Sequence, residues 1–418
     1  MKEKVLLRNA HLPESHRIAT YLSRGGYKNF KKALKEMDPA QITELVKEAG
    51  LRGRGGAGFP AGIKWSFVPK NSGKPIYLLC NADESEPGTF KDIVIMEKDP
   101  HLLLEGIAIA AYAIGVHTAF IYIRGEFHDG ARILEEAIEE ARRENWLGEN
   151  ILETGYSLDI WVHRGAGAYI CGEEMALISS LEGQRGYPRV KPPFPAVSGF
   201  FGCPTIVNNV ETLANVPFII ERGVDWYRTM GSERNYGPKL YCISGHVNNP
   251  GVFELALGEK TLKQLIEEEG KGVPNNKKVK AVFPGGSSAP VLTADEIDVR
   301  ADFDAVQQAG SMLGSAGLIV MDETTDMVNV TLNLARFYAH ESCGQCTPCR
   351  DGSLWLVKVL RRFIEGGGNK DDIDLMLEIC DNIDGRTICP LGAALAWPIR
   401  SVLQKFRSEF EAKLRTDA

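Results

Sequence analysis

The chain has 418 residues, of which 44% are hydrophobic and 25% are charged. This composition excludes a disordered or collagen-like protein, and the length suggests two to four compact domains. The formal net charge of −7 argues against a general nucleic-acid binder, since such proteins present a basic face. Nine cysteines, an odd number in a chain that can bury several cores, favour reduced thiols or metal ligands over a disulfide framework.

The hydropathy pattern predicts neither a membrane span nor a secretory signal. The longest apolar stretch, Leu102 to Ile123, is interrupted by Glu105, His117 and two glycines, so it predicts a buried helix followed by a strand. Residues 1–11 carry charges and lack an apolar core followed by a small-residue cleavage site. We therefore expect a cytoplasmic protein without direct membrane insertion.

The first half of the chain alternates between strand and helix patterns. About forty residues with two weakly helical patches precede a helix that ends at Gly50 and a glycine-rich loop. Strands are then expected at 76–80, 118–123 and 158–162, and helices at 102–113, 131–145 and 173–181. Residues 183–205 are rich in proline and glycine, which predicts a long ordered loop. This alternation is typical of an α/β layer.

The pattern changes from Pro238 onward. Strands at 240–244 and 252–257, a helix at 262–268 and a strand at 279–283 predict a small ββαβ domain. After Asp326 the chain becomes helical to its end, apart from a cysteine cluster and three successive glycines. We expect a helix bundle there.

The cysteines carry the strongest chemical signal. Cys343, Cys346 and Cys349 form a CxxCxxC motif, and Cys389 is followed directly by a proline, as in iron–sulfur proteins that hold a [4Fe-4S] cluster. Four cysteines could also hold a structural zinc, but zinc sites more often use paired CxxC hairpins. Cys380 competes as the fourth ligand; it lies in a helical pattern, where a cysteine usually acts as a small hydrophobe, so Cys389 is preferred.

Two glycine-rich turns are candidates for nucleotide binding. The first fits GxGxxG from Gly53, but a helix pattern precedes it, so it is weak evidence for an ordinary Rossmann site, and an irregular loop remains an alternative. Arg54 and Lys64 would supply positive charge there. The second turn precedes a helix whose first turn holds Glu173 and Glu174, which could accept ribose hydroxyls or simply complement the helix dipole.

Acidic and aromatic residues mark further candidates. Asp83, Glu84 and Glu86 follow the 76–80 strand, at the end of the strand where ligands bind in open α/β sheets; an exposed acidic turn is the alternative. Three phenylalanines come from glycine- or proline-rich segments, which favours stacking on an aromatic ligand, although core packing is nearly as common. They are Phe59, Phe67 and Phe194.

Five motifs together resemble the flavin-containing, NADH-oxidising subunit of respiratory complex I, in one order and over nearly the whole chain. They are GRGGAGFP from Gly53, NADESEPG from Asn81, GAGAYICGEE from Gly165, NNVET from Asn208 and ESCGQCTPC from Glu341. Two residues depart from the pattern: Met175 stands where threonine is expected, and Asp351 where glutamate is common.

The resemblance implies a fold of three parts behind an N-terminal segment. We expect an N-terminal arm with the glycine-rich loop at 1–61, a Rossmann-like FMN- and NADH-binding domain at 62–229, a β-grasp (ubiquitin-like) domain at 230–325, and a helix bundle with the iron–sulfur cluster at 326–418.

The resemblance also implies roles for individual residues. FMN would be surrounded by Gly53, Arg54, Gly55, Lys64, Asn81, Asp83, Tyr169, Gly172, Asn208, Asn209 and Thr212. NADH would be bound by Phe59, Phe67 and Phe194 around adenine, by Lys191 in the same loop as Phe194, by Glu173 and Glu174, and by Glu86 near the nicotinamide as the catalytic residue. The cluster ligands would be Cys343, Cys346, Cys349 and Cys389.

The implied activity is hydride transfer from NADH to FMN, followed by one-electron transfer to the [4Fe-4S] cluster and on towards quinone through other subunits. Expected partners are a thioredoxin-like [2Fe-2S] subunit and the peripheral arm of complex I, at the inner face of the cell membrane. A diaphorase subunit of a soluble NAD-linked hydrogenase or formate dehydrogenase is an alternative, and a zinc-stapled, non-enzymatic assembly module is an alternative of another class.

Overall fold

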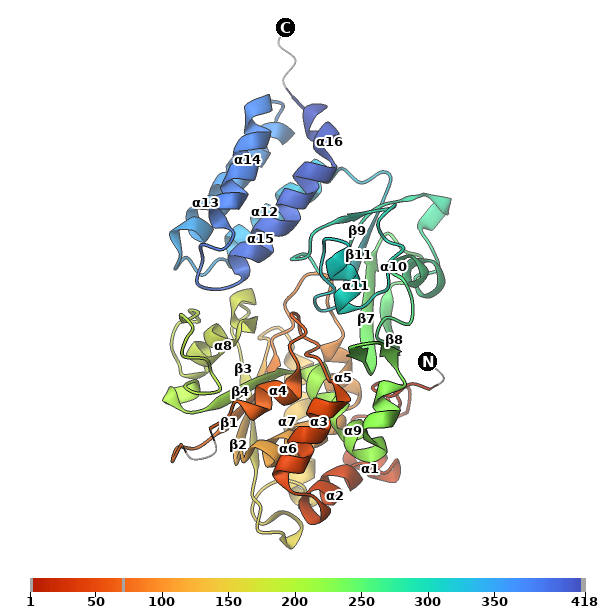
Figure 1. Cartoon of the computed structure of the whole chain (residues 1–418), viewed down its shortest axis with the longest axis vertical. Coiled ribbons are helices and arrows are strands. Elements are labelled where there is room, and N and C mark those ends of the chain that lie inside the picture. Colours follow the sequence, from red (N-terminus) through yellow and green to blue (C-terminus); the bar gives the residue numbers. More distant parts are fainter. Residues whose placement is uncertain (1–2, 70–71, 415–418) are drawn as a thin grey trace.

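The computed structural model describes residues 3–69 and 72–414, which form two large sheets, a two-stranded hairpin and a helical bundle (Figure 1). The first sheet and its helices occupy the lower half of Figure 1, the bundle lies at the top, and the second sheet lies beside it. We call the first sheet with its helices the first part of the molecule, and the second sheet with its helices the second part. One hydrophobic core lies in the first part and another in the second part. A third lies between the first sheet, the second sheet and the bundle. In the described part of the chain, no helix is both long and apolar enough to span a bilayer.

The first sheet consists of four parallel strands in the order β3-β2-β1-β4. Their bounds are β1 Tyr77–Ala82, β2 Thr118–Ile123, β3 Asp159–Arg164 and β4 Thr205–Asn209. The chain builds outward from β1 through β2 to β3 and then returns to the other side of β1. The strand order therefore reverses between β1 and β4, and ligands bind at the carboxyl ends of such a pair.

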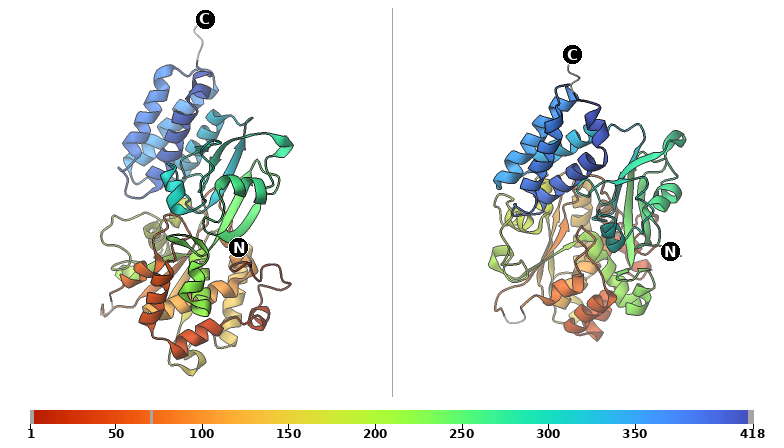
Figure 2. Two further views of the ribbon diagram at one scale, coloured as in Figure 1. Left: turned by 45° about the vertical axis from the view of Figure 1, so that its right-hand side comes forward. Right: turned by 45° about the horizontal axis from the view of Figure 1, so that its top comes forward.

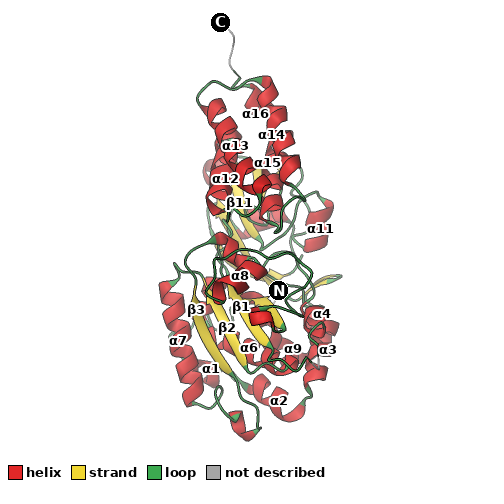
Figure 3. Ribbon diagram, turned by 90° about the vertical axis from the view of Figure 1, so that its left-hand side faces the viewer, coloured by secondary structure: helices red, strands yellow, loops and turns green. Residues whose placement is uncertain are grey.

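Nine α-helices among the described residues up to Arg228 belong to the same part of the molecule as this sheet. They are α1 Ile18–Ser23, α2 Lys28–Glu36, α3 Pro39–Ala49, α4 Ala61–Ser66, α5 Asp92–Lys98, α6 Pro100–Ile114, α7 His128–Arg143, α8 Glu174–Leu181 and α9 Val210–Arg228. Every residue of α6 except Tyr112 is buried, so the longest apolar stretch is a core helix followed by β2, as expected. Figure 3 shows the strands face-on, with α7 along one edge and α8 between the sheet and the bundle.

The two weakly helical N-terminal patches are α1 and α2, and both belong to the first core. Tyr21, Tyr27 and Phe30 are buried there. The buried carboxylate of Glu105 on α6 accepts the Tyr21 hydroxyl and the backbone N–H groups of Tyr27, Asn29 and Phe30. The N-terminal residues are therefore fixed by specific polar bonds as well as by apolar packing.

The second sheet has five strands in the order β10-β9-β11-β7-β8. The strands are β7 Pro238–Gly245, β8 Gly251–Ala256, β9 Val279–Phe283, β10 Leu292–Thr293 and β11 Gly317–Asp322. A hairpin of β5 Gly231–Ser232 and β6 Asn235–Tyr236 precedes them, α10 Leu262–Gln264 continues as a π-helix, and α11 is Phe303–Gln308. In this sheet, β7 and β11 pair in parallel and the other neighbours are antiparallel, which is the mixed arrangement of a β-grasp sheet.

The C-terminal helices form the expected bundle, which Figure 2 shows from two further sides. They are α12 Met327–Glu341, α13 Thr347–Ile364, α14 Lys370–Ile383, α15 Leu391–Lys405 and the short α16 Arg407–Glu411. Asp326 begins α12 by accepting the N–H groups of Val328 and Asn329. Cys343 and Cys346 lie in the turn between α12 and α13, and Cys349 lies in the first turn of α13.

Three of the larger elements were not expected from the sequence. Strand β4 begins at Thr205, the last residue of the proline- and glycine-rich segment, and no strand was predicted there. Helix α9 contains Pro217 and a kink at Gly223, where φ is 81°, and such residues usually end helices. Strand β11 was also not predicted from the sequence. The loop prediction is otherwise confirmed, because residues 183–199 contain no helix or strand.

Candidate active site

The carboxyl ends of β1 and β4 open into a cleft of about 410 Å³. That volume lies in the range of small-molecule and cofactor sites. All three parts of the molecule contribute to its walls. Eight of the residues expected to bind FMN or NADH line it: Gly55, Asn81, Asp83, Glu86, Tyr169, Gly172, Glu173 and Asn209.

Four other expected residues support the cleft from behind. The Arg54 side chain is fully buried and donates to the Tyr227 hydroxyl and to a backbone carbonyl of the hairpin before β7, rather than into the cleft. Its backbone N–H donates to the Thr212 hydroxyl at 2.8 Å. Asn208 accepts the indole N–H of Trp65 at 2.8 Å. The fourth, Gly53, donates its N–H to a carbonyl of the same glycine-rich loop.

The acidic residues after β1 do not form an exposed turn. Asp83 and Glu84 are 8% and 6% exposed, respectively. Glu84 begins α5 by accepting the backbone N–H groups of Lys91, Asp92 and Ile93. Asp83 accepts the Ser85 hydroxyl at 3.1 Å, and burial raises its pKa to about 7. A buried carboxylate with so few partners is poised to accept hydrogen bonds from a ligand in the cleft.

Glu86 joins the three parts of the molecule at the cleft. Its carboxylate accepts the Tyr169 hydroxyl at 2.7 Å, the Ser287 hydroxyl at 3.1 Å and the Ser288 N–H at 2.8 Å. Ser287 also bonds to Tyr338 of α12. Burial raises the pKa of Glu86, and these hydrogen bonds act in the opposite direction. The residue expected to be catalytic is therefore held in place by groups from all three parts, directly or through Ser287.

Four charged residues meet where α4, α8 and the long loop approach one another. Lys191 Nζ lies 2.6 Å from Glu174 and 3.1 Å from Glu173, and Lys64 Nζ lies 2.9 Å from Glu174. Glu173 also caps α8 through the N–H groups of Met175 and the next residue. Burial alone would raise the pKa of Glu174, but the two lysines outweigh it and lower that pKa. Met175, one of the two departures from the motif pattern, is buried and does not line the cleft.

The three candidate stacking residues are not core residues. Phe59, Phe67 and Phe194 are 50%, 54% and 58% exposed, and the rings of Phe59 and Phe67 lie 6.2 Å apart between centroids. Both flank α4, which carries Lys64, while Phe194 lies in the loop of Lys191. Their exposed faces are free to stack on an aromatic ligand outside the cleft.

The cysteine turns converge beside the cleft. Cys346 caps α13, and its sulfur accepts the N–H of Ile388 from the turn that carries Cys389. Burial raises the pKa of Cys349, and the neighbouring Cys343 and Cys346 raise it further. Cys380, in contrast, is fully buried within α14.

The residues present fit both groups implied by the resemblance. The cleft offers glycine backbone for close approach to a flat ring, and an added Cβ at Gly56 would meet open space. Asn and Asp side chains supply donors and acceptors for hydroxyl groups. At the cysteine turns, α13 begins after Cys346 and α15 begins shortly after Cys389, and the N–H of Ile388 donates to the Cys346 sulfur, which favours a negatively charged cluster. Among the described residues, no three His, Cys, Asp or Glu side chains are gathered tightly enough for a single metal ion.

Several cleft residues were missed by the sequence reasoning. They come from the second part (Gly285, Ser288, Met312, Gly314, Ser315), from the bundle (Pro390, Leu391, Ala393, Ala394, Trp397), and from the first part (Gly56, Ala57, Ser85, Thr89, Lys91, Asp92, Ile170). For the turn after Cys389 the CysPro motif was a usable signal, because it places α15 next to the cluster. The loops of the second sheet carry no local signal for ligand binding.

Comparison with known families divides the chain into three matching regions. The model described as the Nuo51 FMN-binding domain matches residues 46–218, and the NADH-ubiquinone oxidoreductase-F iron-sulfur binding region matches residues 329–413. Between them, the SLBB domain matches residues 239–330. The expected FMN and 4Fe-4S cofactors, and the small β-rich domain between their binding regions, are thereby confirmed.

The chain is also similar to individual proteins over its whole length. The second F-type subunit of the NADH-quinone oxidoreductase of Rhizobium meliloti is 55% identical over 99% of this chain and 98% of its own length, and the F-type subunit of Rickettsia massiliae is 50% identical with the same coverage. The crystal structure of an NAD+-reducing [NiFe]-hydrogenase matches with a TM-score of 0.85 and 35% identity, over all of this chain and 68% of that chain. The chain therefore belongs to the family of F-type subunits of NADH-quinone oxidoreductases and carries the FMN-binding and iron–sulfur-binding regions named for such enzymes.

Proposed function

We infer that the protein is the NADH-oxidising subunit of an NADH-quinone oxidoreductase. When bound, FMN accepts a hydride from NADH and the [4Fe-4S] cluster accepts electrons one at a time. The chain's own residues hold the flavin at the ends of β1 and β4, align the nucleotide through the α4, α8 and loop residues, and keep water from the cleft. No side chain needs to act as a base towards NADH, because the hydrogen leaves NADH together with its bonding electron pair, as a hydride.

One observation supports this function most directly. Pro390 and Leu391 line the cleft and follow Cys389 immediately in the chain. Glu173 also lines the cleft, and its carboxylate adds to the increase in the pKa of Cys389 that burial causes. A flavin in the cleft would thus share a wall with the cluster ligands, and an electron would have only a short distance to travel.

We assign residues 1–61 to the N-terminal arm with the glycine-rich loop and residues 62–229 to the FMN- and NADH-binding domain. Residues 230–325 are assigned to the β-grasp domain and residues 326–418 to the helix bundle with the iron–sulfur cluster. The relatives' names describe a subunit of a larger enzyme. We propose that electrons leave through a thioredoxin-like [2Fe-2S] subunit into the peripheral arm, on the inner face of the cell membrane, and reach quinone only through other subunits.

The diaphorase alternative has one observation in its favour, the structural match to an NAD+-reducing [NiFe]-hydrogenase. That chain is longer, since this protein covers 68% of it, whereas the relatives from NADH-quinone oxidoreductases are matched over 98% of their length and with higher identity. The main function is therefore better supported. A zinc-stapled assembly module is not supported, because the matching C-terminal family model is an iron–sulfur binding region.

Cluster ligation can be tested together with the order of electron transfer. We expect Cys389→Ser to lose or alter the [4Fe-4S] signal, while Cys380→Ser, the matched control, keeps it because Cys380 only packs in the core. A folded Cys389→Ser protein should still reduce a two-electron dye with NADH but fail to pass electrons to its [2Fe-2S] partner. Iron and acid-labile sulfide equal to wild type, or unimpaired transfer to the partner, would contradict this assignment.

Preference for NADH over NADPH should depend on Glu174. A 2′-phosphate about 4 Å from its carboxylate would be repelled by roughly 4 kcal/mol at an effective dielectric near 20. Lys64 and Lys191 offset part of this charge, so we expect Glu174→Gln to raise the kcat/KM for NADPH relative to NADH by about tenfold to a hundredfold. Steady-state kinetics with both nucleotides provide the measurement, and Glu135→Gln on the exposed face of α7 is the control. An unchanged ratio with a lowered melting temperature would mean that Glu174 only supports α8.

Asp83 should show a conflict between stability and binding. Its folded-state pKa of about 7 lies above the ordinary carboxyl value, so ionisation destabilises the fold progressively as pH rises from about 4 to 7. We expect Asp83→Asn to stabilise the FMN-free chain by about 1–2 kcal/mol at pH 8, less towards pH 4, and to weaken FMN binding. Denaturant unfolding at several pH values and FMN titration measure the two effects. A pH-independent stability difference would refute the burial argument, and unchanged FMN affinity would remove Asp83 from the site.

A further inference from the structure

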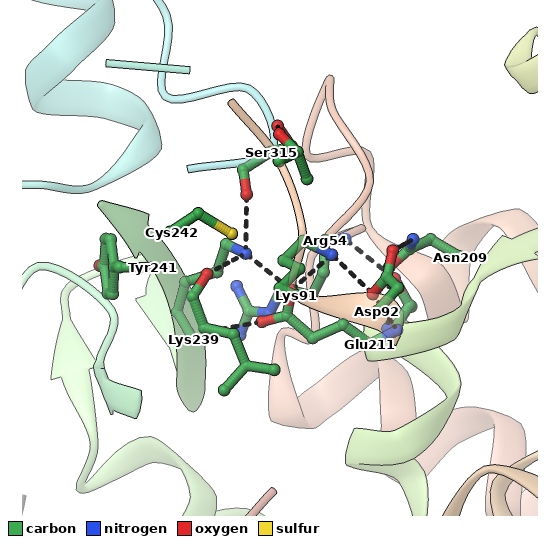
Figure 4. A network of polar contacts seen from close by, with 12 residues as sticks. Arg54, Lys91, Asp92, Asn209, Glu211, Lys239, Tyr241, Cys242 and Ser315 are labelled. Carbon is green, nitrogen blue, oxygen red and sulfur yellow. Dashed lines mark hydrogen bonds and ion pairs between the residues drawn. The ribbon is translucent and has the colours of Figure 1, made fainter. Parts of the chain in front are cut away.

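Five charged side chains are buried together where the first part of the molecule meets the second sheet, and Figure 4 shows this group. Arg54, Lys91, Glu211 and Lys239 are 0% exposed, and Asp92 is 2% exposed. Charged residues are almost never fully buried unless they are paired, and a buried ion pair is weak evidence for stability alone. Glu84, which is 6% exposed, accepts the backbone N–H groups of Lys91 and Asp92, so the buried region holds as many carboxylates as cations. The cluster therefore calls for a functional explanation.

Lys239, at the start of β7, lies at one end of this cluster. Its ammonium group donates to Glu211 at 2.7 Å, to the Leu240 carbonyl at 2.9 Å and to the Ser315 carbonyl at 3.2 Å. These three bonds use all of its N–H groups. Ser315 lines the cleft on the side of the second sheet, and its hydroxyl bonds to that of Thr89, a lining residue from the first part of the molecule. Lys239 thus holds one cleft wall directly.

The other wall is held through a chain of ion pairs. The Glu211 oxygen that accepts from Lys239 also lies 2.8 Å from Lys91 Nζ. Lys91 pairs with Asp92 at 2.8 Å, and the second oxygen of Asp92 accepts the side-chain N–H of Asn209 at 2.6 Å. Lys91, Asp92 and Asn209 all line the cleft. Burial lowers the pKa of Lys239 to about 8, and Glu211 opposes that shift, so the lysine depends on this pair for its charge.

We propose that Lys239 is a positioning residue of the flavin site, although it does not itself line the cleft. From the second sheet it fixes residues on both sides of the cleft, through Ser315 and through Glu211 and Lys91, and it places a buried positive charge close to the cleft. A flavin that has accepted a hydride carries one more negative charge than before, so a buried cation nearby favours the reduced form. This inference rests on the proposed function only in that FMN occupies the cleft.

The test compares three variants of the full-length chain. Lys239→Met removes the charge and the three bonds, and Lys239→Gln removes the charge but retains an amide donor, in case the first variant folds poorly. Lys260→Met is the matched control, because Lys260 belongs to the same domain and pairs with Glu268 and Glu269 away from the cleft. Each FMN-depleted protein is titrated with FMN by fluorescence quenching, and the midpoint potential of the bound flavin is measured at saturating FMN.

We expect both Lys239 variants to bind FMN about tenfold more weakly or worse, and to shift the flavin midpoint potential to more negative values. The control should match wild type in both measurements. A merely structural lysine would lower the melting temperature without moving the potential, so a flavin potential unchanged in Lys239→Gln overturns the proposal. If wild-type protein itself fails to bind FMN, the proposed function fails instead, which keeps the two failures distinguishable.

Discussion

The reversal of strand order between β1 and β4 is the constraint on which the rest of the structure depends. Because β2 and β4 lie on opposite sides of β1, the connections that leave β1 and β4 diverge and leave the carboxyl ends of both strands uncovered. The acidic turn after β1 and Asn209 at the end of β4 therefore face one opening. The second sheet and the bundle close this opening from two further directions, so the cleft exists only when all three parts are assembled.

Burial then determines the chemistry of the cleft. Asp83, Glu84 and Glu86 lie where water is scarce, and each has a raised pKa for that reason. The Glu84 carboxylate accepts hydrogen bonds from the first N–H groups of α5, and the Glu86 carboxylate accepts hydrogen bonds that join the three parts of the molecule. Asp83 therefore has the fewest protein partners of the three. Beneath them, the pairs of Lys91 and Lys239 with Glu211 bring positive charge close to the cleft without exposing it. The site thus combines acceptors for hydroxyl groups with buried lysine–carboxylate pairs.

The sequence was sufficient for features with a local or periodic signal. The α6 helix, the ββαβ order, the bundle and the CxxCxxC motif all depend on residues near one another in the chain, and the fourth cysteine was marked by the proline that follows it. Helix α9 escaped because proline and glycine residues usually interrupt helices, whereas here tertiary packing retains Pro217 and Gly223 within it. Strand β4 has only five residues and adjoins the proline- and glycine-rich segment, so no separate strand was predicted there. Arg54 illustrates a second limit: a glycine-rich loop indicates a nearby ligand but not the direction of each side chain. Lys239 illustrates a third limit. The sequence of a single strand does not show that both of its faces are covered, so the burial of a lysine in β7 could not be predicted.

The central claim is that electrons from NADH enter at the cleft and reach the cysteine cluster. An anaerobic titration of the purified protein with NADH, followed by optical and EPR spectroscopy on the same samples, tests it most directly. We expect the flavin absorbance to fall and the EPR signal of the reduced [4Fe-4S] cluster to grow as NADH is added. A flavin that is bleached by NADH beside a cluster that responds only to a chemical reductant would show that the cluster is off the path, and an unbleached flavin would contradict NADH oxidation in the cleft.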